Sequence, residues 1–190
     1  MSDFSPEFEG FEKLARWNRE VFVTEKIDGT NAQVVVSDDG LSLIAGSRTR
    51  WITPSDDNFG FARWVEENKT DLLNLGPGRH FGEWFGKGIQ RNYGLADKRF
   101  SLFNVSRWDT AARPACCSVV PTLWRGNMED LDVTAIMNGL RDGGSVAAPG
   151  WSKPEGIVIY HVASGQSFKK TFDKDDAPKN KPRDKDGNVL

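Results

Sequence analysis

The chain has 190 residues, 38% of them hydrophobic, and its 25 Lys and Arg against 27 Asp and Glu give a formal net charge of -2. This length suits one domain with one core, and no apolar run is long enough to cross a bilayer, so we expect no membrane partner. The balanced charge excludes a long-range field for polyanions, so any polynucleotide must be held by a local basic surface. The acidic, polar start Met1-Ser2-Asp3-Phe4 differs from a secretory signal, which favours a cytoplasmic location.

The first 46 residues predict a short helix followed by a β-meander. Phe8, Phe11 and Leu14 recur at near-helical spacing, which indicates a helix within residues 4–17. Three strands are expected next, at residues 20–27, 31–37 and 41–46. Hairpin signals join them at Asp28-Gly29 and at Asp38-Asp39-Gly40.

The remainder alternates helices with further strands. A helix is expected between Asp57 and Leu75, capped by Asp56 or Asp57 and stopped by Gly76-Pro77-Gly78. A second helix is expected near 128–141, started by Asn127 and ended by Gly143-Gly144, and strands are expected at 79–85, 99–105, 156–162 and 166–172. Strands gathered at both ends with helices between them favour an α+β fold with antiparallel sheets.

The domain is expected to span residues 1–172. From Asp173 onward the chain is charged, contains prolines and has few apolar residues, which predicts a mobile tail over 173–190. The two cysteines, Cys116 and Cys117, are adjacent and have no further partner for a disulfide framework or zinc site. We expect both to be buried and reduced.

The segment Glu25-Lys26-Ile27-Asp28-Gly29-Thr30-Asn31 places a lysine where an apolar strand enters a tight turn. An amine nucleophile must be held rigidly, partly desolvated and near other cations to be neutral near pH 7, since its ordinary pKa is ~10.4. Lys26 is therefore a candidate for covalent nucleotide chemistry. On this segment alone, a solvated lysine in a β-hairpin is the better explanation, because Lys-x-Asp-Gly is short enough to occur often by chance.

Five further segments follow Lys26 along the chain: Ser47-Arg48, Phe81-Gly82-Glu83-Trp84-Phe85-Gly86, Phe100-Ser101-Leu102-Phe103, Pro154-Glu155-Gly156-Ile157-Val158-Ile159 and Phe168-Lys169-Lys170. Over about residues 20–172, this series resembles the covalent nucleotidyltransferase superfamily of ATP-dependent DNA ligases, RNA ligases and mRNA capping enzymes. The Lys26 segment is most similar to the branch of RNA-editing ligases and nick-sealing phage RNA ligases. The whole chain resembles a small bacteriophage RNA ligase.

The resemblance implies a role for each matching residue. Lys26 would be the nucleophile, and Lys169 and Lys170 would bind the α-phosphate. Strand alternation sends these last two to opposite faces, which favours Lys169. Glu83 would bind the ribose of the nucleotide, and Phe103 would stack on its adenine, unless Phe103 is simply a core residue. The other nucleotide-binding residues would be Asp28, Asn31 and Arg48. Glu155 would hold Mg²⁺ or Mn²⁺. Apart from the resemblance, Arg50, Lys87 and Arg91 are candidates for polynucleotide contacts, and a solvated loop explains Lys87 and Arg91 equally well.

Two positions depart from the family pattern. Asn104 stands where aspartate is common after the aromatic residue, and Lys169-Lys170-Thr171 replaces the usual Lys-x-Lys. The first puts any role for position 104 in question, and the second separates the two lysines across the strand.

The resemblance implies an ATP-dependent RNA ligase that joins 3′-hydroxyl and 5′-phosphate ends through a lysyl-AMP. It would act as a monomer, in the host cytoplasm if a phage encodes it, on RNA ends or a nicked duplex, with DNA as a further substrate. Only 18 residues follow Phe172, too few for the OB-fold domain of DNA ligases and capping enzymes, so none is expected. A minimal DNA ligase and a nucleotide- or end-binding protein that does not complete sealing are the alternatives.

Overall fold

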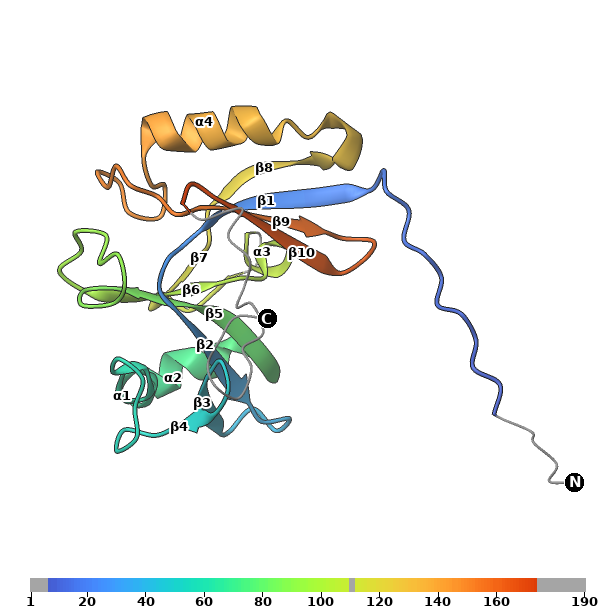
Figure 1. The fold of residues 1–190 in the computed structure, drawn as a ribbon. Coiled ribbons are helices and arrows are strands. Elements are labelled where there is room, and N and C mark those ends of the chain that lie inside the picture. Colours follow the sequence, from blue (N-terminus) through green and yellow to red (C-terminus); the bar gives the residue numbers. More distant parts are fainter. Residues whose placement is uncertain (1–6, 110–111, 174–190) are drawn as a thin grey trace, which may run out of the picture.

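The computed structural model describes residues 7–109 and 112–173, which form two β-sheets covered by helices (Figure 1). The first sheet has the strand order β10-β9-β1-β8 and the second β4-β3-β2-β5-β6-β7. The strands are β1 (Glu20–Lys26), β2 (Thr30–Val36), β3 (Leu43–Ser47), β4 (Trp51–Ile52), β5 (Gly78–Gly86), β6 (Lys98–Leu102), β7 (Cys117–Val119), β8 (Thr122–Asn127), β9 (Gly156–His161) and β10 (Gln166–Thr171). The helices are α1 (Phe61–Glu67), α2 (Lys69–Leu72), α3 (Val105–Trp108) and α4 (Val133–Gly143), with 3-10 turns η1 (Leu73–Leu75) and η2 (Met128–Asp130). The predicted α+β class is confirmed.

The first sheet is built around β1, which is hydrogen-bonded on both edges. Val23 pairs with Trp124 of β8 on one side and with Ile159 of β9 on the other. Helix α4 lies over this sheet (Figure 1), and its Met137 and Leu140 pack with the buried β-branched residues of β1 and β9. Strand β1 is therefore a fixed base for the residue at its end, Lys26.

Helix α4 begins later than the sequence indicated. The expected cap, Asn127, precedes the η2 turn, and the helix starts after Asp132, whose carboxylate accepts a hydrogen bond from the Ala135 amide at 2.9 Å. It ends at Gly143, where Gly144 has φ 78°, a conformation that glycine adopts without strain.

The second sheet packs its inner face on α1 and α2. Phe61, Trp84 and Phe100 form the centre of this core, with Phe61 and Phe100 rings 5.0 Å apart. The helix expected between Asp57 and Leu75 occurs as α1, α2 and η1 in succession. Asp57 does serve the start of α1, because its carboxylate accepts hydrogen bonds from the backbone amides of Ala62 and Arg63.

The predicted hairpin at Asp28-Gly29 is wrong. Strand β1 belongs to the first sheet and β2 to the second, so the chain crosses between sheets here instead of turning back. A Cβ atom on Gly29 would lie 2.4 Å from the Trp84 carbonyl oxygen, which shows how closely the crossing passes β5. The hairpin at Asp38-Asp39-Gly40 is confirmed, since β2 and β3 are antiparallel and Val36 pairs with Leu43.

Other expectations also need correction. Residues 7–17 contain no helix and run away from the body as an exposed arm (Figure 1). The second sheet is not wholly antiparallel, because β6 and β7 run parallel. Strand β6 ends at Leu102 and α3 follows, so 103–105 is not strand. Strands β4, β7 and β8 were not predicted.

The cysteines partly match their expectation. Cys117 is buried and Cys116 is half-buried, and both are free, with their sulfur atoms 4.0 Å apart. Burial raises the pKa of the Cys117 thiol. No helix among residues 7–109 and 112–173 is long and apolar enough to span a membrane.

Candidate functional site

A cleft of about 870 Å³ is lined by residues from both sheets. Pockets of this size accommodate cofactor-sized ligands. The cleft brings together six of the residues singled out from the sequence: Lys26, Asn31, Arg48, Glu83, Phe103 and Lys169. They come from separate segments, so the fold gathers them.

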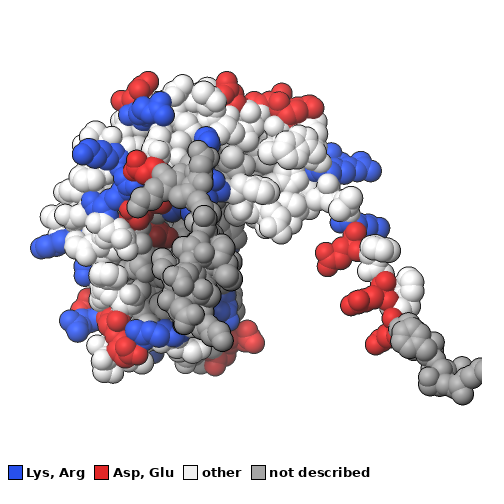
Figure 2. All heavy atoms as spheres, in the orientation of Figure 1, with Lys and Arg blue, Asp and Glu red and all other residues white. Residues whose placement is uncertain are grey.

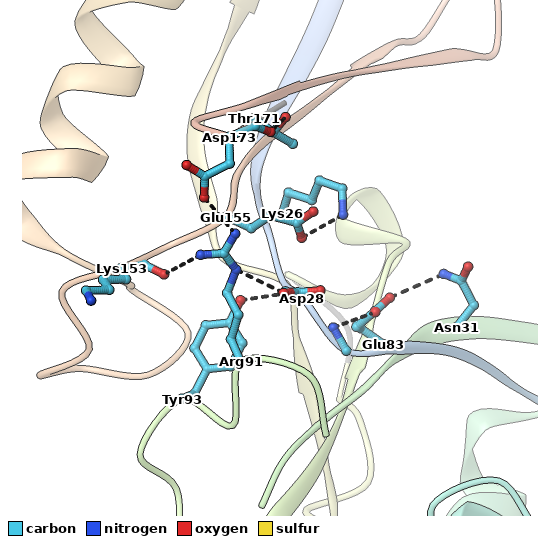
Figure 3. Close-up of polar contacts among 11 residues, drawn as sticks. Lys26, Asp28, Asn31, Glu83, Arg91, Tyr93, Lys153, Glu155, Thr171 and Asp173 are labelled. Carbon is cyan, nitrogen blue, oxygen red and sulfur yellow. Dashed lines mark hydrogen bonds and ion pairs between the residues drawn. The ribbon is translucent and has the colours of Figure 1, made fainter. Parts of the chain in front are cut away.

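Lys26 lies at the end of β1 and is held by Glu155. Its Nζ donates a hydrogen bond to the Glu155 carboxylate at 2.7 Å, in an ion pair that is partly accessible to solvent (Figure 3). Lys26 also pairs across the sheet with Gly156, the first residue of β9. The amine is therefore fixed at the wall of the cleft, while a ligand can still reach it.

Glu83 lies on β5 across from this ion pair and is 8% exposed. Its carboxylate accepts hydrogen bonds from the Gly29 amide at 3.0 Å and from the Asn31 side-chain amide at 3.2 Å (Figure 3). Burial raises the pKa of Glu83 to about 7, although the Gly29 hydrogen bond and the charge of Lys26 act in the opposite direction. Both protonation states of Glu83 are therefore present near neutral pH.

Glu83→Gln is expected to change how stability depends on pH. A carboxyl whose pKa rises from 4.5 to about 7 on folding binds its proton more tightly in the folded state, so it lowers stability as pH rises through this interval. At pH 8 the free energy of unfolding of the wild-type protein is lower by about 3 kcal/mol for this reason. Urea unfolding at pH 4.5 and pH 8 should show the variant gaining about that much relative to wild type at the higher pH.

The exposed Glu129 provides the matched control, since Glu129→Gln removes a carboxylate that is not buried. It should change the unfolding free energy equally at both pH values. An equal offset for Glu83→Gln at the two pH values would contradict the buried-carboxyl explanation.

Asp28 faces away from the cleft wall, toward Arg91. Its carboxylate accepts from Arg91 Nε at 2.9 Å, and its backbone amide donates to the Tyr93 hydroxyl at 2.7 Å (Figure 3). Arg91 also contacts the Asp173 carboxylate at 3.3 Å. These contacts tie the turn after Lys26 to the end of β10. Asp28 and Arg91 are not among the residues lining the cleft, so their ligand-binding roles stay predictions.

The two lysines of β10 occupy different surroundings. Lys169 lines the cleft together with Val158, its partner on β9, whereas Lys170 does not line it. This follows from the alternation of side chains along a strand. The structure thus separates the pair in the way that the spacing indicated.

The remaining candidates are divided between the cleft and other surfaces. Arg48 is exposed and lines the cleft, as does Phe103, which is 39% exposed and is therefore not a core residue. Arg50 lies outside the cleft in an ion pair with Asp56. Lys87 lines a separate shallow hollow beside Trp84. The polynucleotide contacts of Arg50 and Lys87 stay predictions.

Asn104 has a structural role at the departure from the family pattern. Its side-chain oxygen accepts from the Arg107 amide at 3.1 Å and so caps α3. An asparagine or aspartate suits this cap equally well, which explains how the residue can differ without disturbing the backbone beside Phe103.

Glu25 is a site-adjacent residue that the sequence reasoning missed. It is 1% exposed, and its carboxylate accepts hydrogen bonds from the Ser145 hydroxyl at 2.6 Å and from the amides of Val146 and Ala147 at 2.8 Å. These bonds fasten a loop 120 residues away in sequence to the residue before Lys26. An acid inside an apolar strand was the available signal, since burial of a carboxylate is unfavourable without such donors.

The donors near Lys26 fit a magnesium or manganese ion that uses few protein ligands. Among residues 7–109 and 112–173, no three His, Cys, Asp or Glu side chains cluster to hold a metal by themselves. Glu155 is not among the residues that line the cleft, but its carboxylate contacts the Lys26 amine at the cleft wall, and Mg²⁺ commonly binds through one or two carboxylates together with substrate phosphates. Such an ion would therefore require the nucleotide as a co-ligand.

Charges of both signs are interspersed over the face drawn in Figure 2. This agrees with the net charge of -2 and shows no uniform cationic surface on that face. Attraction of a polyanion would depend on individual cations such as Arg48 and Lys169 in the cleft.

Comparison with known proteins identifies similar folds. The RNA ligase family matches residues 19–172. Variants of Naegleria gruberi RNA ligase are similar in structure: one solved with ATP and Mn has a TM-score of 0.60 and 21% identity over 83% of this chain and 51% of its own. Another, solved with AMP and Mn, has a TM-score of 0.57 and 20% identity over 82% and 50%. The chain thus spans about half the length of the solved RNA ligases that it matches.

Proposed function

The chain belongs to the RNA ligase family, and from this premise we propose that it is an ATP-dependent ligase that joins RNA 3′-hydroxyl and 5′-phosphate ends. The observation that carries the proposal is the position of Lys26. Its amine lies on the cleft wall, 2.7 Å from Glu155, in a cleft that also contains Glu83 and Lys169. One amine nucleophile among groups suited to a ribose and to phosphates is the arrangement that nucleotidyl transfer requires.

In the first step, the Lys26 ammonium, which is partly accessible to solvent, transfers a proton to water, and the neutral amine attacks the α-phosphorus of ATP. A phosphorus–nitrogen bond forms as the bond to the β-phosphate oxygen breaks, and pyrophosphate leaves. Lys169, from β10 of the same sheet, stabilises the charge that develops on the α-phosphate oxygens. The Glu155 ion pair holds the amine in place before the nucleotide arrives.

The nucleotide is oriented by residues of the second sheet. Glu83 and Asn31, already hydrogen-bonded to each other, present acceptor and donor groups to the ribose. The exposed ring of Phe103 offers a flat surface to the adenine, and Arg48 offers a fixed cation to a phosphate. A magnesium or manganese ion held by Glu155 would neutralise phosphate charge and help to align the displacement.

Sealing needs two further displacements. An oxygen of the RNA 5′-phosphate attacks the AMP phosphorus, which releases Lys26 and leaves an adenylated RNA end. The 3′-hydroxyl of the other end then loses its proton and attacks the RNA phosphorus, and AMP leaves as the new phosphodiester forms. Both steps reuse the cations that bound the ATP phosphates.

The test is a sealing assay with ATP, Mg²⁺ or Mn²⁺ and RNA labelled at its 5′-phosphate, supplied as a nicked duplex and as single strands. We expect an adenylated RNA intermediate and a longer sealed strand. The same ends made of DNA serve as the comparison, since only the RNA carries a 2′-hydroxyl. Faster sealing of DNA would favour a minimal DNA ligase, and AMP on the protein without transfer to any end would favour an end-binding protein.

A further inference from the structure

A row of exposed side chains continues from the cleft across the second sheet. Arg79, Phe81 and Glu83 alternate along β5, so they point to the same face, and all three line the cleft. Trp51 of β4 completes the row. Trp51 is 50% exposed and Phe81 51% exposed, so both are available to a ligand.

The three outer residues of this row, Trp51, Arg79 and Phe81, form an ordered stack that we call the platform. The Arg79 guanidinium lies 5.5 Å from the Trp51 ring centre and 5.9 Å from that of Phe81, within the range of cation–π attraction. Arg79 also donates a hydrogen bond to the Gln33 side chain at 2.9 Å. These contacts hold the guanidinium between the two rings.

The Trp51 ring packs against the backbone of Gly46. Gly46 pairs with Trp51 between β3 and β4, and a Cβ atom on it would lie 3.0 Å from the ring edge and 2.8 Å from the Gln33 side chain. The absence of a side chain therefore allows the ring to rest against the sheet. The platform is a built surface, fixed by the strands beneath it.

The platform is continuous with the site proposed for adenine. The Phe103 amide donates to the Phe81 carbonyl at 2.9 Å, so the two rings come from directly opposed positions of the β5–β6 edge. Arg79 and Phe81 themselves line the cleft. From Glu83 to Arg79, four residues of strand extend about 13 Å, which is the rise of about four stacked nucleotides at ~3.4 Å each.

We propose that the platform binds unpaired bases of the RNA strand beside the end that is joined, an inference that rests on the proposed ligase function and specifies its substrate. Flat rings stack on bases of any sequence, and Arg79 adds a cation for the base face or the phosphate. The bases of a duplex are already stacked and paired, so they cannot present their faces to these rings. The platform therefore selects ends with single-stranded character.

The test compares binding of a short single-stranded RNA and of a duplex RNA of the same length, by fluorescence anisotropy at one fixed salt concentration. Trp51→Ala should weaken binding of the single strand about 5- to 140-fold, since loss of one stacking ring has an effect of this size. Trp51→Phe should retain most of the affinity. Arg79→Lys should weaken binding too, because lysine keeps the charge but loses the planar stack.

The matched control is Phe168→Ala on β10. Phe168 is 54% exposed, similar to Trp51, and neither ring lines the cleft, but Phe168 belongs to the first sheet and not to the platform. This variant should bind the single strand as wild type does. Gly46→Ala provides a second disturbance of the platform, which displaces the Trp51 ring without removing it and should weaken binding in the same direction.

Three results would overturn the inference. The first is single-strand binding by Trp51→Ala and Arg79→Lys within twofold of wild type. The second is an equal loss for the duplex, which would assign the face to paired RNA. The third is a dimer of wild type that Trp51→Ala dissociates, which would assign it to a second copy of the chain. Failure of the ligase proposal is seen separately, as the absence of a sealed strand when the wild-type protein is given ATP, a divalent metal ion and RNA ends.

Discussion

Lys26→Ala is expected to take up no covalent label from α-labelled ATP, whereas the wild-type protein becomes labelled in the presence of Mg²⁺ or Mn²⁺. Lys26 carries the only amine that the structure holds against Glu155 in the cleft, among the residues described. Without it, the phosphorus–nitrogen bond cannot form. The measurement is denaturing electrophoresis, which retains only covalently bound AMP, on protein freed of nucleotide beforehand.

Lys153→Ala is the control for this experiment. Lys153 is an exposed lysine close to Glu155 in sequence, and its backbone carbonyl, not its side chain, accepts from Arg91 and Trp151. It should be labelled like wild type. The unfolding curve of Lys26→Ala should show a folded protein, and label that persists on that folded variant would refute Lys26 as the nucleophile.

Lys169→Ala should lower the rate of label uptake about 100- to 1,000-fold, while Lys170→Ala should lower it less than about tenfold. A loss of about 100- to 1,000-fold, as expected for Lys169→Ala, is the usual effect of removing one group that stabilises charge in a transition state. Lys169 lines the cleft and Lys170 does not, although they are neighbours on one strand. Single-turnover labelling at saturating ATP measures the difference directly.

Each of these two variants removes one positive charge from β10, so a difference between their labelling rates reports the position of the side chain and not the loss of charge. Their unfolding free energies should be compared first, because Lys170 has contacts of its own. Equal losses of rate in two folded variants would mean that proximity to the phosphate does not follow the strand alternation. A greater loss for Lys170→Ala would reverse the assignment.

Elements that depend on neighbouring residues could be predicted from the sequence. The β2–β3 hairpin follows from Asp38-Asp39-Gly40, whose residues suit a tight turn, and β9 and β10 follow from their apolar and alternating patterns. The end of α4 follows from Gly143-Gly144. In each case the signal and the structure lie within a few residues of each other.

Pairing between distant segments could not be predicted in this way. Asp28-Gly29 has the composition of a hairpin turn, yet the residues before it pair with β8 and β9 and those after it with β3 and β5. Strand β8 itself, with only partly buried and exposed residues, lacks the clear alternation that would identify it. The arm at 7–17 has apolar residues at helical spacing but no described surface against which to bury them.

The candidate site shows the same division. The order of motifs identified Lys26, Glu83 and Lys169, which the fold brings to one cleft. It did not reveal that Asp28 would bind Arg91 or that Glu25 would hold the loop at Ser145, because these partners are far away in sequence and no local pattern specifies them. Motif order thus pointed to residues that line one cleft, and tertiary contacts determined which neighbouring side chains face it.

The position of β1 also sets the timing of assembly. Its two hydrogen-bonding partners, β8 and β9, are translated long after it, and the loop that satisfies Glu25 lies 120 residues downstream. Such long-range closure is slow, and unpaired strand edges expose a growing chain to misassembly. On a ribosome, the second sheet up to β6 can pair before the partners of β1 are made, and Lys26 reaches its final surroundings only when β9 has emerged.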